Sequence, residues 1–166
     1  GRMEDRRPIE RIGILGAGAW GCALAIAAHR AGRSVILQAH EPDVAATIAR
    51  DHANPRFLPD VPLPPTIRAV TSSTEAVANA DAVLIATPTQ HVRATLAIAA
   101  PVWPRGVPAV ICAKGLEQGS CALLSEVVAQ TLPGAPVAVL SGPSFAAEVA
   151  RSLPTAVTLA CADAAI

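Results

Sequence analysis

One short segment constrains this chain more than any other: residues 16–21 read Gly-Ala-Gly-Ala-Trp-Gly, between an apolar run and an alanine-rich stretch. The apolar run predicts a strand and the alanine-rich stretch a helix. In such a unit Gly16 permits the tight turn, Gly18 lets a phosphate approach the backbone, and Gly21 lets the helix pack on the strand. The helix N-terminus adds N–H groups and partial positive charge. The segment therefore predicts a dinucleotide site, with a ligand-free tight turn as the alternative.

Length and composition predict one domain with an aliphatic core, because 52% of the 166 residues are hydrophobic and only 2% aromatic. The formal net charge is zero, without a basic stripe, which argues against nucleic acid as a partner. No apolar run reaches the about 18 residues of a membrane span, so no integral membrane segment is expected. Residues 1–10 are charged at their start and carry Met3 after Gly1-Arg2, so we expect a disordered or tag-derived terminus.

The four cysteines are scattered, without a C-x-x-C pair, at Cys22, Cys112, Cys121 and Cys161. This pattern predicts reduced and mostly buried thiols rather than a disulfide framework, and it favours a cytoplasmic protein. No spacing typical of a metal site is present, so no metal is expected.

Strands and helices alternate along the chain. Apolar runs predict strands at 12–15, 35–38, 67–70, 82–86, 109–112, 137–140 and 156–160. Helices are predicted at 20–31, 43–50, 75–80, 91–100, 121–131 and 145–150, with Gly32 as a C-terminal signal and Ser72 with Glu75 as a capping box. The fold class is α/β, a Rossmann-type doubly wound, mostly parallel sheet with helices on both faces, spanning residues 11–166. The proline-rich residues 55–65 are expected to form a loop.

Candidate ligand-binding residues follow several predicted strands, where ligands of open parallel sheets bind. Lys114 is the one lysine among thirteen basic residues, and a compact ammonium there could reach a carbonyl or phosphate oxygen. The segments 87–91, 141–144 and 38–41 follow three other strands. Each also has a plainer interpretation: a surface lysine, common turns, or solvated histidines, with His91 more typical of a cap or surface residue than of a base.

Taken together, the motifs resemble the N-terminal domain of bacterial NAD(P)-dependent glycerol-3-phosphate dehydrogenase. The matching segments are G-A-G-A-W-G-x-A-L-A (16–25), N-P-R-F-L-P-D-V-P-L-P (54–64), T-P-T-Q-H-V-R (87–93), A-K-G-L-E (113–117), S-G-P-S-F-A-A-E-V (141–149) and L-P-T-A-V (153–157). They run in order over nearly the whole chain. The resemblance implies hydride transfer between NAD or NADP and the dihydroxyacetone phosphate/sn-glycerol 3-phosphate pair, which feeds phospholipid synthesis.

The resemblance also implies residue roles. The cofactor-binding residues would be Gly16, Gly18, Ala19, Trp20, Gly21, His40, Pro88, Lys114 and Ala146. The substrate-binding residues would be Lys114, Gly142 and Ser144. The family's general acid/base lysine belongs to a helical C-terminal domain, so no catalytic residue is expected here, and the chain is expected to be a fragment of an enzyme that could be a homodimer. Two departures are Gln38, where members often have tryptophan, and Cys22, where threonine is frequent.

Two other functions remain open at this point. The chain could be a stand-alone NAD(P)-binding or redox-sensing module without turnover. It could also belong to a related dehydrogenase acting on a hydroxy acid or an amino acid, although the segments 113–117 and 141–145 argue against that. The preference between NAD and NADP does not follow from the sequence.

Overall fold

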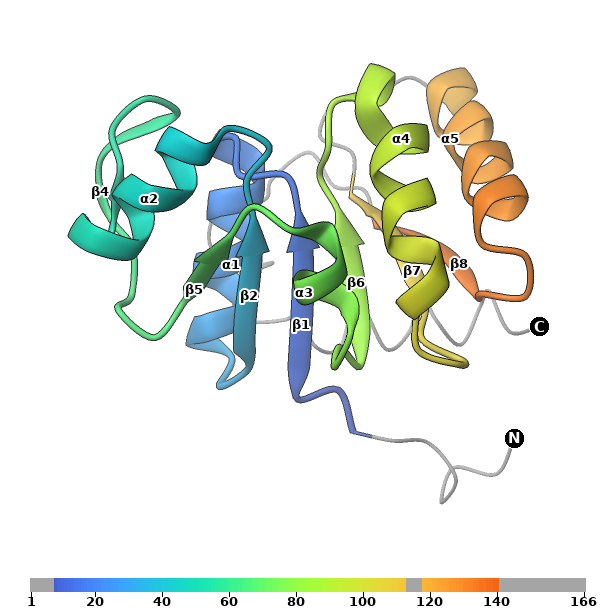
Figure 1. The fold of residues 1–166 in the computed structure, drawn as a ribbon, viewed down its shortest axis with the longest axis horizontal. Coiled ribbons are helices and arrows are strands. Elements are labelled where there is room, and N and C mark those ends of the chain that lie inside the picture. The colour runs from blue at the N-terminus through green and yellow to red at the C-terminus, as the bar shows by residue number, and fades with distance from the viewer. Residues whose placement is uncertain (1–7, 113–117, 141–166) are drawn as a thin grey trace.

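The computed structural model describes residues 8–112 and 118–140 (Figure 1). In the second range, the side chains are described from residue 122 onward. Six strands of these residues form one parallel sheet in the order β5-β2-β1-β6-β7-β8. They are β1 (Arg11–Leu15), β2 (Ser34–Gln38), β5 (Arg68–Val70), β6 (Ala82–Ile85), β7 (Ala109–Cys112) and β8 (Val137–Leu140). The chain leaves β1 toward one edge and β6 toward the other. This strand order confirms the predicted Rossmann-type fold and puts its switch point between β1 and β6.

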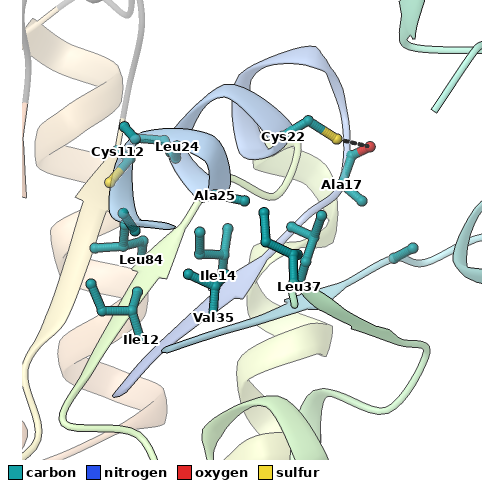
Figure 2. Close-up of a cluster of buried hydrophobic side chains, with 14 of the residues drawn as sticks. Ile12, Ile14, Ala17, Cys22, Leu24, Ala25, Val35, Leu37, Leu84 and Cys112 are labelled. Carbon is teal, nitrogen blue, oxygen red and sulfur yellow. Dashed lines mark hydrogen bonds between the residues drawn. The ribbon is translucent and has the colours of Figure 1, made fainter. Parts of the chain in front are cut away.

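Helices cover both faces of the sheet (Figure 1). They are α1 (Ala19–Arg30), α2 (Pro42–Asp51), α3 (Ser73–Val77), α4 (Thr89–Ala99), the 3-10 turn η2 (Ala100–Val102) and α5 (Gln118–Thr131). Alternate strand residues supply two aliphatic cores. Ile12 and Ile14 of β1 pack beneath α1 with Leu84 of β6 (Figure 2), whereas Val83 and Ile85 face the core under α3, α4 and α5. Burial on both faces is why these strands read as continuous apolar runs.

The predicted helix ends at two positions are confirmed. Gly32 follows α1 with φ of +83°, and the N–H of Arg33 donates to the carbonyl of Ala28 as α1 closes. At the start of α3 the Ser72 hydroxyl accepts from the N–H of Glu75 at 3.2 Å. The Glu75 carboxylate does not complete a capping box with Ser72. It pairs with Arg68 at 3.2 Å instead.

The proline-rich segment is more ordered than the loop that its composition predicts. Within it β4 (Leu58–Pro62) pairs antiparallel with the short β3 (Ala53–Asn54), and the hairpin packs through Phe57 and Leu58 against the core under α1. Proline is tolerated here because a two-stranded hairpin leaves one edge of each strand without ladder hydrogen bonds.

The remaining predicted elements lie within three residues of their observed bounds where the structure describes them. The predicted helix at 145–150 and strand at 156–160 lie outside the described residues. Ahead of β1, Ile9 packs against the core and the N–H of Glu10 donates to Asp81 at 3.0 Å, so the last residues of the expected disordered terminus contact the fold. Among the described helices, none has the length and apolarity to cross a membrane.

Candidate functional site

The three glycines of the turn after β1 meet different constraints. Gly16 has φ of +105°, and a Cβ there would lie 2.7 Å from backbone atoms of Ala86. A Cβ on Gly21 would overlap the carbonyl oxygen of Gly16. The tight turn itself therefore requires glycine at 16 and 21. Gly18 differs: its φ is −73°, and a Cβ would meet no described atom within 4 Å. The fold of the described residues does not require glycine at position 18.

The N-terminus of α1 begins at this turn. Gly18 is its N-cap residue and supplies no side-chain hydrogen bond, and the first turn carries no acidic side chain. A helix start of this kind keeps its partial positive charge, which favours a nearby anion. The backbone of the turn is bonded to the end of β2, because the N–H of Gly16 donates to the carbonyl of Gln38 at 3.0 Å. The turn is thus fixed to the neighbouring strand β2, and a Cβ on Gly18 would meet no described atom within 4 Å.

Trp20, in the first turn of α1, connects this turn to the end of β7. Its indole Nε1–H donates to the backbone carbonyl of Cys112 at 3.2 Å. The side chain is half-buried against the core under α1. Lys114 follows Cys112 by two residues but lies outside the described residues. Ala19, beside Trp20, is exposed at the helix start.

Two exposed histidines meet at the same end of the sheet. His40 follows β2, and His91 lies in the first turn of α4 after β6. Their rings are stacked, with centroids 5.3 Å apart and planes 15° from parallel. Since β2 and β6 are the two neighbours of β1, the pair joins the segments on either side of the glycine turn. The sequence singles out His40 but treats His91 as a cap or surface residue.

The segment after β6 is attached to β1. The hydroxyl of Thr87 donates to the carbonyl of Leu15 at 3.1 Å. Pro88 is exposed and is the N-cap residue of α4. This attachment puts the start of α4 next to the end of β1, where the glycine turn begins.

The residues at the tip of β2 explain one departure from the family pattern. Gln38 is buried, and its side-chain Nε2 donates to the carbonyl of Thr71 at 3.1 Å. Its side chain therefore connects the end of β2 to the segment after β5. Glu41 is the N-cap residue of α2 through its backbone carbonyl, and its side chain makes no capping hydrogen bond.

One residue that sequence reasoning missed is Asn54, which is 1% exposed. Its side-chain Nδ2 donates to the carbonyl of Ala17 at 2.8 Å, within the glycine turn itself. The residue is in the motif 54–64, but nothing in a single sequence shows that this hairpin folds against the turn.

Several predicted residues lie outside the described part of the chain, namely Lys114, Gly142, Ser144 and Ala146. The same holds for Cys161 and for the side chain of Cys121.

The described cysteines, Cys22 and Cys112, are buried free thiols, as predicted for both. Burial raises the pKa of the Cys22 thiol despite the hydrogen bond from Asn54, and burial also raises the pKa of Cys112. Such thiols are poor nucleophiles. Within the residues described, no cluster of three or more His, Cys, Asp or Glu is arranged to hold a metal ion.

The strand order and the glycine turn define the class: a Rossmann-type α/β domain with a glycine-rich turn after its first strand. Residues 11–166 match the family model described as the NAD-dependent glycerol-3-phosphate dehydrogenase N-terminus, and the chain belongs to this family.

Bacterial relatives are similar over nearly the whole chain. The glycerol-3-phosphate dehydrogenase [NAD(P)+] of Paramagnetospirillum magneticum is 54% identical over 154 residues, which cover 93% of this chain and 56% of that protein. The enzyme of the same name from Rhodospirillum rubrum is 55% identical over 158 residues, 95% of this chain and 45% of that protein. The chain thus spans about half the length of the curated relatives it matches.

Solved structures agree with this assignment. The crystal structure of glycerol-3-phosphate dehydrogenase from Coxiella burnetii has a TM-score of 0.74 and 35% identity, covering 87% of this chain and 44% of that one. A ketopantoate reductase from Ralstonia eutropha, at 19% identity and a TM-score of 0.59, shares the fold. That match covers 78% of this chain and 40% of the reductase.

Proposed function

We propose that this chain is the cofactor-binding domain of a glycerol-3-phosphate dehydrogenase and that it binds the pyrophosphate of NAD or NADP on the turn at Gly16–Gly21. The observation that carries the proposal is the contrast between the three glycines. Gly16 and Gly21 are needed by the tight turn, whereas Gly18 has ordinary backbone angles and open space above it. A ligand-free turn accounts for the first two glycines but not for the third. A phosphate approaching the backbone accounts for all three.

The remaining residues that we assign to the cofactor lie around this turn or follow from the family pattern. Ala19 and Trp20 lie at the start of α1, where N–H groups and the helix dipole favour phosphate oxygens. The exposed His40 follows β2, the strand whose end meets the adenosine ribose in this fold, and Pro88 begins α4 on the other side. From the family pattern we assign Ala146 and Lys114 to the cofactor, and Lys114, Gly142 and Ser144 to the substrate.

The activity proposed for the whole protein is reversible hydride transfer. A hydride passes from reduced NAD or NADP to the carbonyl carbon of dihydroxyacetone phosphate, and a proton is added to its oxygen to give sn-glycerol 3-phosphate. The nicotinamide supplies the hydride when bound. The residues of this chain bind and orient, while the proton donor belongs to a helical substrate domain beyond the domain of residues 11–166. A homodimer, a role in phospholipid synthesis and a cytoplasmic location are parts of the same proposal.

The alternative of a redox-sensing module is weaker for a specific reason. A thiol sensor needs an exposed cysteine with a lowered pKa. Of the four cysteines, the two whose side chains the structure describes, Cys22 and Cys112, are buried with raised pKa values, and neither suits this role. The other alternative, a stand-alone binding module without turnover, is distinguished from an enzyme by the measurements that follow.

Two measurements test the proposal. Calorimetric titration of the 166-residue chain with NADH and NADPH should give saturable binding, and the chain should not oxidise either cofactor with dihydroxyacetone phosphate, because the substrate domain that closes the site is not part of it. The protein at its full natural length should catalyse that oxidation. Binding without turnover by the full-length protein would favour the stand-alone module, and failure to bind either cofactor would overturn both.

A further inference from the structure

Asn54 joins the hairpin to the glycine turn through three hydrogen bonds of its side-chain amide. Its Nδ2 donates one hydrogen bond to the carbonyl oxygen of Ala17 at 2.8 Å and another to Cys22 Sγ at 3.2 Å. Its Oδ1 accepts from the backbone N–H of Phe57 at 3.3 Å, within the hairpin. The Phe57 contact fixes which end of the amide carries oxygen, so the NH2 group faces the turn. The side chain is therefore held by its own hairpin and aimed at one peptide of the turn.

That peptide joins Ala17 to Gly18. In a trans peptide the C=O and the next N–H point in opposite directions. Because buried Asn54 holds the Ala17 carbonyl toward the protein interior, the Gly18 N–H is directed away from it. Among the described residues, none accepts a hydrogen bond from the Gly18 N–H. A Cβ built on Gly18 would also meet no atom of the described residues within 4 Å.

The second contact of the Ala17 carbonyl is much weaker. Cys22 Sγ lies 3.6 Å from the same oxygen (Figure 2), the distance of a weak thiol hydrogen bond. The amide of Asn54 is therefore the stronger of the two donors to this carbonyl and the one that fixes the orientation of the peptide.

We propose that Asn54 is a positioning residue for cofactor binding: by fixing the Ala17–Gly18 peptide it presents the Gly18 N–H to the pyrophosphate. This inference rests on the proposed function, because it needs a dinucleotide on the glycine turn. On this proposal, the role of the β3–β4 hairpin is to position Asn54 next to the glycine turn.

The test is a comparison of ligands with and without phosphates on the full-length protein. Asn54→Ala should raise the Kd for NADH and for ADP about tenfold or more, the effect of one lost hydrogen bond to a charged group, and change the Kd for adenosine less than about twofold. A merely structural role would leave all three affinities unchanged or weaken them together. In steady-state assays the KM for NADH should rise while kcat at saturating NADH stays near that of the wild type.

Two control variants separate the causes. Cys22→Ala removes the sulfur partner of Asn54 but leaves its bond to Ala17, so the Kd for NADH should stay within about twofold. Ser72→Ala removes the N-cap hydrogen bond of α3, which is not part of the glycine turn. It should lower stability and leave the Kd for NADH within about twofold.

A second measurement applies even where Asn54→Ala does not fold. On adding NADH to the wild type, the amide resonance of Gly18 should shift more than that of Gly32, at the other end of α1. Equal NADH affinity in wild type and Asn54→Ala, or an unmoved Gly18 resonance in a wild type that binds NADH, would overturn the role of Asn54. A wild type that binds no NADH would instead overturn the proposed function.

Discussion

The imidazole rings of His40 and His91 stack at 5.3 Å between centroids, although they follow strands on opposite sides of β1. A histidine side chain can donate a hydrogen bond to a phosphate oxygen. The contact brings a second such side chain to the edge where His40 is expected to meet the adenosine ribose. Glu41 is the nearest acidic residue in sequence, and it is half-buried at the start of α2.

This pair leads to a prediction on cofactor choice. We expect the full-length enzyme to accept NADPH at least as well as NADH, because a histidine beside the ribose can donate a hydrogen bond to the 2′-phosphate. His40→Asp should reverse the preference, since a carboxylate binds the 2′-hydroxyl and repels a 2′-phosphate. The measurement is kcat/KM for both cofactors in wild type and variant. His29→Asp, at the opposite end of α1, is the control; a wild type that does not use NADPH would contradict the prediction.

A second prediction follows from the open space above Gly18. Gly18→Val should abolish measurable NADH binding, because the branched side chain would occupy the position of the pyrophosphate. The domain should stay folded: φ of −73° suits any residue, and losing glycine at an N-cap costs about 1 kcal/mol. Titration beside a thermal melt tests both parts. Gly32→Ala, at φ of +83° in open space away from the turn, should lower stability by about 1 kcal/mol and leave NADH affinity unchanged.

The outcome at Gly18 would be informative in either direction. Unchanged NADH affinity in Gly18→Val would remove the turn from the binding site. Complete unfolding would show that this glycine, too, serves the fold.

The sequence predicted the sheet well because the signal is local. Continuous apolar runs such as Val83–Ile85 and the turn at Gly16 report burial and backbone geometry within a few residues. It could not predict the hairpin at 53–62, because β3 has only two residues and β4 carries two prolines and is mostly exposed. It also missed Asn54 and His91, since the partners of these side chains, Ala17 and His40, are far away in the chain and meet only through the sheet order.

A third prediction concerns Lys114, which the sequence alone singles out. In the full-length enzyme Lys114→Arg should lower kcat/KM about ten- to a hundredfold, the effect of losing one charged hydrogen bond. A planar guanidinium does not replace a compact ammonium aimed at a substrate oxygen. Arg105→Lys, an exposed position in the loop before β7, is the charge-conserving control and should have kinetics like the wild type. Kinetics of Lys114→Arg within about twofold of the wild type would make Lys114 a surface residue.

The last prediction concerns acid stability. The Asp81 carboxylate oxygen Oδ2 accepts from the N–H groups of Arg11 and Glu10 at 2.8 and 3.0 Å, where the chain enters β1. Partial burial raises the pKa of Asp81, but these backbone donors, with the Arg11 guanidinium 3.6 Å away, outweigh it and hold the pKa below its ordinary value. A carboxyl with a lowered pKa in the folded state stabilises the fold above its unfolded value of about 3.9, and this contribution is lost as the pH falls through the folded value.

Asp81→Asn keeps an acceptor of the same shape but removes the charge. It should lower the free energy of unfolding by about 1 to 2 kcal/mol at pH 7, because hydrogen bonds to charged groups are stronger than neutral ones. The difference between wild type and variant should persist down to about pH 5 and shrink below about pH 4, where the carboxyl gains its proton first in the unfolded chain and, at lower pH, in the folded state. Urea unfolding at a series of pH values measures this. Asp51→Asn, which removes an exposed pair with Arg50, should change stability little because solvent screens that pair. A wild-type advantage over Asp81→Asn that does not change between pH 7 and pH 3 would mean that the side chain stabilises the start of β1 by shape and packing rather than by charge.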